Sequence, residues 1–133
     1  MKAMTTEHPL ILIVEDEKPL IHALHDKLQR EGFEILQAQN GKDGLALALE
    51  KHPDLILLDI IMPIMDGVTM LRELRKDEWG KFARVIMLTN LTDAEKTEEA
   101  LRTGASDYLI KADWKLEDLI NKIKGTLHAS GVI

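Results

Sequence analysis

Apolar residues along the chain are concentrated in five short runs that are separated by longer segments of mixed polarity. The runs are rich in Ile, Leu and Val and begin at intervals of roughly 20 to 30 residues: Leu10–Val14, Glu34–Ala38, Leu55–Leu58, Arg84–Leu88 and Asp107–Ile110. Runs of this length are typical of β-strands. The nearly continuous apolar character of the first, third and fourth runs indicates strands that are buried on both faces.

The segments between the first runs carry the signals of amphipathic helices. Pro19 suits the first turn of a helix that ends at Gly32. Asn40 can cap a second helix, which must stop before Pro53. The first of these helices places three apolar side chains on one face: Ile21, Leu24 and Leu28.

Three further helix signals occupy the second half of the chain. The pair Asp66–Gly67 is typical of a turn that starts a helix. The segment Thr92–Glu95 has the pattern of a capping box and predicts a polar helix that ends near Gly104. The last helix carries an apolar stripe made of Leu116, Leu119, Ile120, Ile123 and Leu127.

The alternation of strand and helix signals predicts the fold class. Five βα units favour an α/β domain of three layers, with a doubly wound, parallel five-stranded sheet in the middle. A chain of 133 residues is long enough for one domain with an ordinary core. We expect residues 10–128 to form this domain, residues 1–9 to be an N-terminal extension and residues 129–133 to be a C-terminal tail.

Composition and charge exclude several classes of function. With 17 basic and 23 acidic residues the formal net charge is −6, which disfavours direct, non-specific binding to nucleic acid. The chain has no cysteine, so a disulfide framework or a thiolate metal site is excluded. No apolar run is long enough to cross a bilayer, and no signal-peptide core precedes Leu10. We therefore expect a cytoplasmic protein without a membrane partner.

Polar side chains follow four of the predicted strands. Because the carboxyl ends of parallel strands meet at one edge of a sheet, we expect these side chains to converge there, whatever the order of the strands. We expect Asp59 to be pushed out at this edge rather than buried. A lone aspartate after a strand is usually a turn or cap residue, but several strand ends here carry complementary groups. They are Glu15, Asp16 and Glu17 after the first run, Asp59 after the third, Thr89 and Asn90 after the fourth, and Lys111 after the fifth.

These groups predict a site for a hard cation and a phosphate. Carboxylate oxygens without His or Cys suit Mg²⁺, or the similar Mn²⁺, held together with water and a phosphate. Lys111 offers a point charge to a phosphate, and Thr89 offers a hydroxyl donor. One aspartate can then act as a nucleophile that accepts a phosphoryl group, while the cations neutralise the developing charge.

The same residues carry a resemblance to a known family. They are Glu15-Asp16, Asp59-x-x-Met62-Pro63-x-Met65-Asp66-Gly67, Thr89, Tyr108 and Lys111. In these motifs and their spacing the chain resembles, from about Leu10 to Leu127, the receiver domain of bacterial two-component response regulators, of the chemotaxis-regulator type. The resemblance implies a flavodoxin-like sheet with strand order 2-1-3-4-5.

The resemblance also implies a signalling switch rather than an enzyme. A histidine kinase or a phosphotransfer protein would donate a phosphoryl group to this chain, which would at most phosphorylate and dephosphorylate itself. Phosphorylation would change the face built from the fourth helix, fifth strand and fifth helix, and this face would regulate an output protein. The receiver would be a monomer or a dimer linked to phosphorylation.

Roles for single residues follow from the same resemblance. Asp59 would be the phosphoacceptor. Asp16 and Asp59, with the backbone carbonyl of Ile61, would hold the metal ion, and Glu15 would support it through water. Lys111 would pair with the phosphoryl group. A further pair of residues would form the switch, in which Thr89 moves to bond the phosphoryl group and Tyr108 follows by changing rotamer.

The sequence departs from the family pattern near the site. Lys111 is followed by Ala112 instead of the usual proline, so the bond between them is either trans with a different loop or an unusual cis bond. Asn90 replaces a smaller residue, which can narrow access to the phosphoryl group or offer it an amide donor. Ile61 and Leu91, two positions beyond Asp59 and Thr89, cannot orient a hydrolytic water, so we expect a long-lived phosphorylated form.

Other functions are also compatible with an α/β fold. A flavin or dinucleotide site is disfavoured, because acidic residues follow the first strand and no G-x-G-x-x-G motif occurs. A phosphatase of the haloacid dehalogenase type needs a second aspartate where this chain has Ile61. An interaction-only pseudo-receiver, which never accepts phosphate, stays open because of Asn90 and Ala112.

Overall fold

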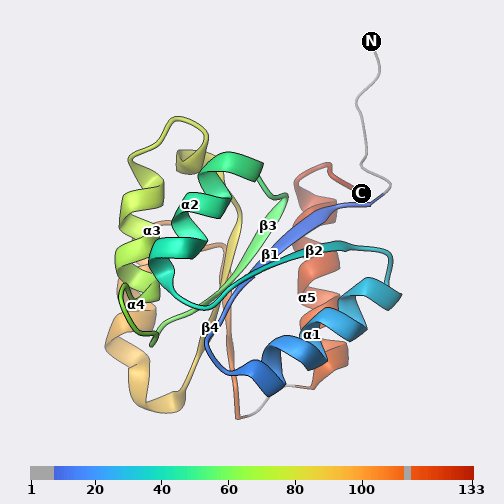
Figure 1. Ribbon diagram of the computed structural model, residues 1–133, viewed down its shortest axis with the longest axis horizontal. Coiled ribbons are helices and arrows are strands. Elements are labelled where there is room, and N and C mark those ends of the chain that lie inside the picture. The colour runs from blue at the N-terminus through green and yellow to red at the C-terminus, as the bar shows by residue number, and fades with distance from the viewer. Residues whose placement is uncertain (1–7, 113–114) are drawn as a thin grey trace.

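The computed structural model describes residues 8–112 and 115–133 and shows a sheet flanked by helices on both faces (Figure 1). Its five strands are parallel and lie in the order β2-β1-β3-β4-β5, which confirms the predicted order. The strands are β1 (Leu10–Val14), β2 (Glu34–Ala38), β3 (Leu55–Asp59), β4 (Val85–Thr89) and β5 (Asp107–Ile110). Asp59 and Thr89 are thus the last residues of their strands, one position later than predicted.

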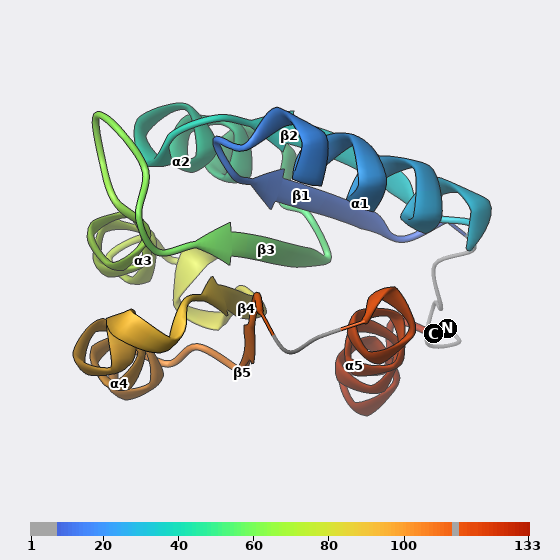
Figure 2. The ribbon, with the colours of Figure 1, turned by 90° about the horizontal axis from the view of Figure 1, so that it is seen from below.

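The helices form the two outer layers. Helices α2, α3 and α4 cover one face of the sheet, and α1 and α5 cover the other (Figures 1 and 2). The bounds are α1 (Lys18–Arg30), α2 (Gly41–Lys51), α3 (Gly67–Arg75), α4 (Ala94–Arg102) and α5 (Leu116–Ala129), with short 3₁₀ turns η1 (Gly80–Phe82) and η2 (Leu91–Asp93). Among the described residues, no helix has the length and apolar character needed to cross a membrane.

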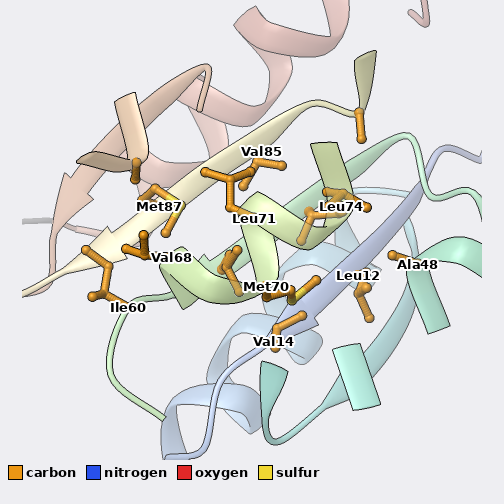
Figure 3. Packing of buried hydrophobic residues seen from close by; sticks show 14 of the residues in the cluster. Leu12, Val14, Ala48, Ile60, Val68, Met70, Leu71, Leu74, Val85 and Met87 are labelled. Carbon is orange, nitrogen blue, oxygen red and sulfur yellow. The ribbon is translucent and has the colours of Figure 1, made fainter. Parts of the chain in front are cut away.

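Two hydrophobic cores lie on opposite faces of the sheet, because alternate side chains of a strand point in opposite directions. Leu12 and Val14 of β1 pack with α2 and α3, as Figure 3 shows for the first core. Ile11 and Ile13 of the same strand pack with α1 and α5. The residues of β3 and β4 are buried throughout. This packing holds the carboxyl ends of the central strands rigidly side by side.

Local capping signals were predictive for two helices and misleading for a third. The side chains of Asn40 and Asp66 each accept a backbone N–H at 2.8 Å and cap α2 and α3, as expected. The capping box predicted at Thr92–Glu95 is wrong: Thr92 lies in the 3₁₀ turn η2, and the N-cap residue Asp93 makes no side-chain cap bond. The backbone N–H of Asp93 donates to the carbonyl of Asn90 at 3.0 Å, so a tighter turn replaces the start of the helix.

The C-terminal residues are more ordered than a tail. Helix α5 continues to Ala129, one residue beyond the expected domain boundary. The N–H of Val132 donates to the carbonyl of Leu127 at 3.0 Å, and the Val132 side chain packs into the second core. Val132 is therefore part of the folded unit. Of the N-terminal extension that we expected, residues 1–7 lie outside the described residues.

Arg75, at the end of α3, ties this helix to the end of α4. Its Nε and Nη2 donate to the carbonyls of Thr103 and Gly104 at 3.0 and 2.8 Å. Its Nη1 donates to the carbonyls of Gly80 and Ala83 at 2.6 and 2.9 Å. The C-terminal end of α4 is therefore anchored by a single guanidinium.

Candidate functional site

Three carboxylates lie together beyond the ends of β1 and β3. Val14 pairs with Leu58 in the sheet, so the residues that follow them, Glu15 and Asp59, are neighbours. Carboxylate oxygens of Glu15, Asp16 and Asp59 all lie within 4.8 Å of one another. This donor set is purely anionic oxygen, which is the chemistry that a hard divalent cation requires.

The expectation that Asp59 is pushed out at the sheet edge rather than buried is wrong, because only 3% of Asp59 is exposed. Asp59 is itself a ladder residue of the central strand β3 and pairs with Leu88 of β4. Glu15 is fully buried, whereas Asp16 is exposed. The cluster thus has two buried carboxylates and one that faces solvent, where a cation from solution can reach it.

Lys111, which directly follows β5, supplies the positive charge of the site. Its Nζ lies 2.7 Å from Oε1 of Glu15, 3.1 Å from Oδ1 of Asp59 and 3.3 Å from Oε1 of Glu17. The peptide bond between Lys111 and Ala112 is trans. Of the two alternatives for this bond, the trans form is the one present. Lys111 still reaches the three carboxylates, although alanine rather than proline follows it.

The two buried carboxylates are also oriented by backbone groups. Oδ1 of Asp59 accepts the N–H of Ile60 at 2.9 Å, and Oε2 of Glu15 accepts the N–H of Glu17 at 3.0 Å. Among the described residues, Oε1 of Glu15 accepts no hydrogen bond. The ammonium of Lys111, 2.7 Å away, compensates the negative charge of this oxygen. A buried oxygen that is only partly satisfied fits a site that can take up a further cation.

Burial and crowding of charge perturb both ionisable partners. Burial, together with the charge of Glu15, raises the pKa of Asp59 from 3.8 to about 7, although Lys111 opposes the shift. Burial alone would lower the pKa of Lys111, but its contacts with Glu15 and Asp59 together raise that pKa above the ordinary value. Lys111 is therefore a permanent cation, and Asp59 is only partly ionised near neutral pH, so an added positive charge nearby favours its ionised form.

The loop that follows Asp59 is held closely against it. The N–H of Gly67 donates to the carbonyl of Ile60 at 2.8 Å. A Cβ atom on Gly67 would lie only 2.1 Å from the carbonyl oxygen of Asp59, so only glycine fits here. Between these points Ile61 is 47% exposed at the rim of the site. The sequence indicated the pair Asp66–Gly67 as a helix start. Gly67 also lets the start of α3 lie directly against the backbone of Asp59.

The structure does not place the Thr89 hydroxyl with the carboxylates. Its Oγ1 contacts Oγ1 of Thr97 on α4 at 2.7 Å and donates toward the carbonyl of Asn90 at 3.2 Å. A cavity of about 360 Å³ between α4 and β5 is lined by Thr89, Thr97 and Tyr108, among other residues. Tyr108 is 38% exposed and Asn90 is exposed. The side chain of Leu91 lies outside what the structure describes.

One residue of the site, Thr97, was not selected from the sequence, and the contacts of another, Glu17, were not foreseen. Glu17 was expected at this edge, but its hydrogen bond to Lys111 and its N–H bond to Glu15 were not foreseen. Thr97 lies within a charge-rich helical segment that reads as a solvated face, yet it is buried. Its burial depends on how α4 packs on β4, for which the local sequence carries no signal.

The comparisons with known proteins agree with this geometry. The sequence profile described as "Response regulator receiver domain" matches residues 11–124. The chain belongs to the response regulator receiver domain family. Receiver domains of this family are signalling switches of two-component systems rather than conventional enzymes.

The relatives that this receiver domain matches include a transcriptional regulator and a chemotaxis regulator. It is 34% identical over 119 residues to the DNA-binding dual master transcriptional regulator RpaA of Synechocystis, covering 90% of this chain and 49% of that protein. It matches the structure of the chemotaxis response regulator CheY4 of Vibrio cholerae with a TM-score of 0.81 and 30% identity, covering 88% of this chain and 97% of the other. The chain spans about half the length or less of the curated relatives that it matches.

One solved relative bears on the acidic cluster. The receiver domain of the sensor histidine kinase PA1611 of Pseudomonas aeruginosa was solved with a magnesium ion coordinated in its active-site cleft. It matches this receiver domain with a TM-score of 0.80 and 28% identity, covering 88% of this chain and 97% of that one.

Proposed function

We propose that this receiver domain accepts a phosphoryl group on Asp59 from a histidine kinase or a phosphotransfer protein. The observation that carries the proposal is the buried Asp59 carboxylate, which has Lys111 at 3.1 Å and the carboxylates of Glu15 and Asp16 beside it. A lone cap or turn aspartate would need neither the buried lysine nor the acidic neighbours.

The transfer is a nucleophilic displacement at phosphorus. An oxygen of Asp59 attacks the phosphorus atom of phosphohistidine, an O–P bond forms and the P–N bond breaks. The electron pair of the broken bond stays on the imidazole, which is protonated on its other nitrogen and leaves neutral. Lys111 stays charged throughout because its pKa is raised, so it pairs with the incoming phosphoryl oxygens.

A divalent cation suits the acidic cluster. Asp16, Asp59 and the backbone carbonyl of Ile61 would hold Mg²⁺, or the similar Mn²⁺, with Glu15 supporting it through water. The bound ion supplies charge neutralisation for the phosphoryl oxygens and for the carboxylates that meet there. Within the chain itself, Asp59 must lose its proton before it can attack, and any added cation near Glu15 favours that loss.

The signal would leave the site through Thr89 and Tyr108. Thr89 turns its hydroxyl toward the phosphoryl group, and Tyr108 moves into the cavity between α4 and β5 that the two residues line. The face formed by α4, β5 and α5 then binds an output protein, or a second phosphorylated copy of this chain. Residues 10–128 contain all of these groups, and the fold that holds them extends to Val132.

The test is labelling with acetyl phosphate and Mg²⁺, followed by intact-mass measurement. We expect the parent chain to gain one phosphoryl group and Asp59→Asn to gain none. Asp26→Asn, which removes an exposed aspartate from α1, is the matched control and labels like the parent. If none of the three is labelled, the chain is an interaction-only receiver; sustained phosphate release from a generic phosphomonoester would instead identify a phosphatase.

A further inference from the structure

Thr89 is engaged in a chain of hydrogen bonds that leads into α4. The Thr97 hydroxyl donates to the carbonyl of Asp93 at 2.9 Å and lies 2.7 Å from the Thr89 hydroxyl. Each hydroxyl has one proton, so if the proton of Thr97 goes to Asp93, the short contact is donated by Thr89. In the reverse assignment Thr89 donates to the carbonyl of Asn90 at the longer distance of 3.2 Å. Either way the one Thr89 proton is already used.

This contact is a buried polar link between α4 and the end of β4. Both partners are largely buried, with 2% of Thr89 and 7% of Thr97 exposed. The other polar contacts of α4 are of a different kind. Lys96 and Glu99 pair at the surface with Asp66 and Arg72 of the α3 region, and the C-terminal end of the helix is anchored by Arg75. The N-terminal half of α4 is therefore joined to the end of β4 through the Thr89 hydroxyl.

We propose that Thr97 is a positioning residue that holds the Thr89 hydroxyl on α4 while Asp59 is unmodified. This inference rests on the proposed function and deepens it. With the Thr97 proton on the carbonyl of Asp93, Thr89 is the donor to Thr97. In this assignment one proton cannot be donated to Thr97 and to a phosphoryl oxygen at the same time, so phosphorylation breaks the contact. Thr97 keeps its bond to Asp93 afterwards, so the contact breaks without leaving an orphaned hydroxyl. Release of Thr89 thereby frees the first turns of α4.

The shape of the surroundings supports such a release. The cavity of about 360 Å³ that Thr89, Thr97 and Tyr108 line borders the contact directly. Room for a side-chain movement therefore exists on the side of α4 where Tyr108 lies. Removing the Thr97 hydroxyl should shift the unmodified protein toward the arrangement in which Thr89 is free. Since an intramolecular hydrogen bond has a modest net effect, the shift is expected to be about two- to tenfold.

The variants are chosen to separate a hydrogen bond from packing. Thr97→Val removes the hydroxyl but keeps the shape of the side chain. Thr97→Ala also removes the hydroxyl and introduces a residue that favours helix. Thr97→Ser keeps the hydroxyl. Thr126→Val is the matched control, because the Thr126 hydroxyl makes the same type of bond to the carbonyl four residues earlier, at 2.9 Å, but on α5. Two measurements are made on the full chain: the Thr89 rotamer from NMR couplings without added ligand, and titration with beryllium fluoride and Mg²⁺ as a phosphoryl mimic.

We expect Thr97→Val and Thr97→Ala to change the Thr89 rotamer populations before any mimic is added, and to bind the mimic about two- to tenfold more tightly than the parent. Thr97→Ser and Thr126→Val should behave like the parent in both measurements. An unchanged Thr89 rotamer with unchanged or weaker binding in both hydroxyl-free variants would overturn the role of Thr97. A parent chain that binds no mimic and accepts no phosphoryl group would instead overturn the proposed function, while the rotamer measurement still decides whether Thr97 holds Thr89.

Discussion

Nζ of Lys111 lies 2.7 Å from Oε1 of Glu15, a residue with no exposed surface, and the same ammonium lies 3.1 Å from Oδ1 of Asp59. One cation therefore compensates two buried carboxylates that come from different strand ends. If Lys111 turns toward a phosphoryl group, Glu15 loses its counter-charge unless another cation is near. In the proposed function, a metal ion beside Asp16 would supply that second cation.

Lys111→Met should strongly destabilise the metal-free protein. Removing one partner of a buried ion pair typically lowers the free energy of unfolding by about 3–5 kcal/mol, because the remaining charge is left uncompensated. We expect a loss of this size at pH 8 in urea unfolding with a chelator present. Added Mg²⁺ should restore part of the loss, because it supplies the missing positive charge to the carboxylates.

Lys122→Met is the matched control for this variant. Lys122 pairs with Asp107 at 2.8 Å, but both side chains are about one-third exposed. Exposed pairs contribute about 0–1 kcal/mol, so the control should unfold close to the parent. Equal losses for Lys111→Met and Lys122→Met would show that the buried position of Lys111 has no special importance.

Asp59 should make the metal-free protein less stable as the pH rises. Its pKa is raised from 3.8 to about 7 in the folded chain, mainly by burial and by Glu15. Between these two values the folded state binds the proton more tightly than the unfolded state, so raising the pH favours unfolding. Asp59→Asn removes this dependence and should therefore melt at a higher temperature than the parent at pH 8, with the difference shrinking toward pH 4.

The measurement is thermal unfolding with a chelator across this pH range. Asp26→Asn again serves as the control, since Asp26 is exposed on α1 and its loss should leave the pH profile of the parent unchanged. Parallel profiles for the parent and Asp59→Asn would contradict a raised pKa for Asp59.

The fold was predictable because its signals are local and repeated. Apolar runs such as Leu55–Leu58 marked the central strands, and the chain positions of Asp59 and Lys111 relative to those runs placed both at the same edge of the sheet. The strand order itself came from the resemblance to the family. Where a signal was purely local, as in the capping box at Thr92, the turn between β4 and α4 overrode it.

The finer geometry of the site was not predictable. The exposure of Asp59 and the direction of the Thr89 hydroxyl both depend on how the folded chain packs around them. In the structure the Thr89 hydroxyl contacts that of Thr97, eight residues later. Thr97 is one polar residue in a polar segment, so the sequence pattern cannot distinguish its buried position from an exposed one. These features arise from tertiary packing rather than from spacing along the chain.

Ile64→Gly should stabilise the protein. Ile64 is 77% exposed and has φ 71, a left-handed conformation that a β-branched residue adopts only under strain. Glycine relieves that strain but gains freedom in the unfolded chain, so we expect a net increase of roughly 0.5–1 kcal/mol in the free energy of unfolding. Urea unfolding provides the measurement.

Ile64→Val is the control, because it stays β-branched and should not share the gain in stability. A loss of stability in Ile64→Gly would mean that Ile64 makes a favourable contact that outweighs its backbone strain.

Ile61→Asn should shorten the lifetime of the phosphorylated chain. Ile61 lies in the loop directly after Asp59 and is 47% exposed, so its side chain borders solvent near the acyl phosphate but cannot bind water. An asparagine there can hold and orient a hydrolytic water. A hydrogen bond of ordinary strength then accelerates hydrolysis by about two- to tenfold. Decay of the phosphorylated form after removal of acetyl phosphate gives the rate. Ile64→Asn, the same substitution at an exposed position three residues further on, should decay like the parent. A decay of Ile61→Asn no faster than this control would contradict a role of Ile61 in limiting hydrolysis.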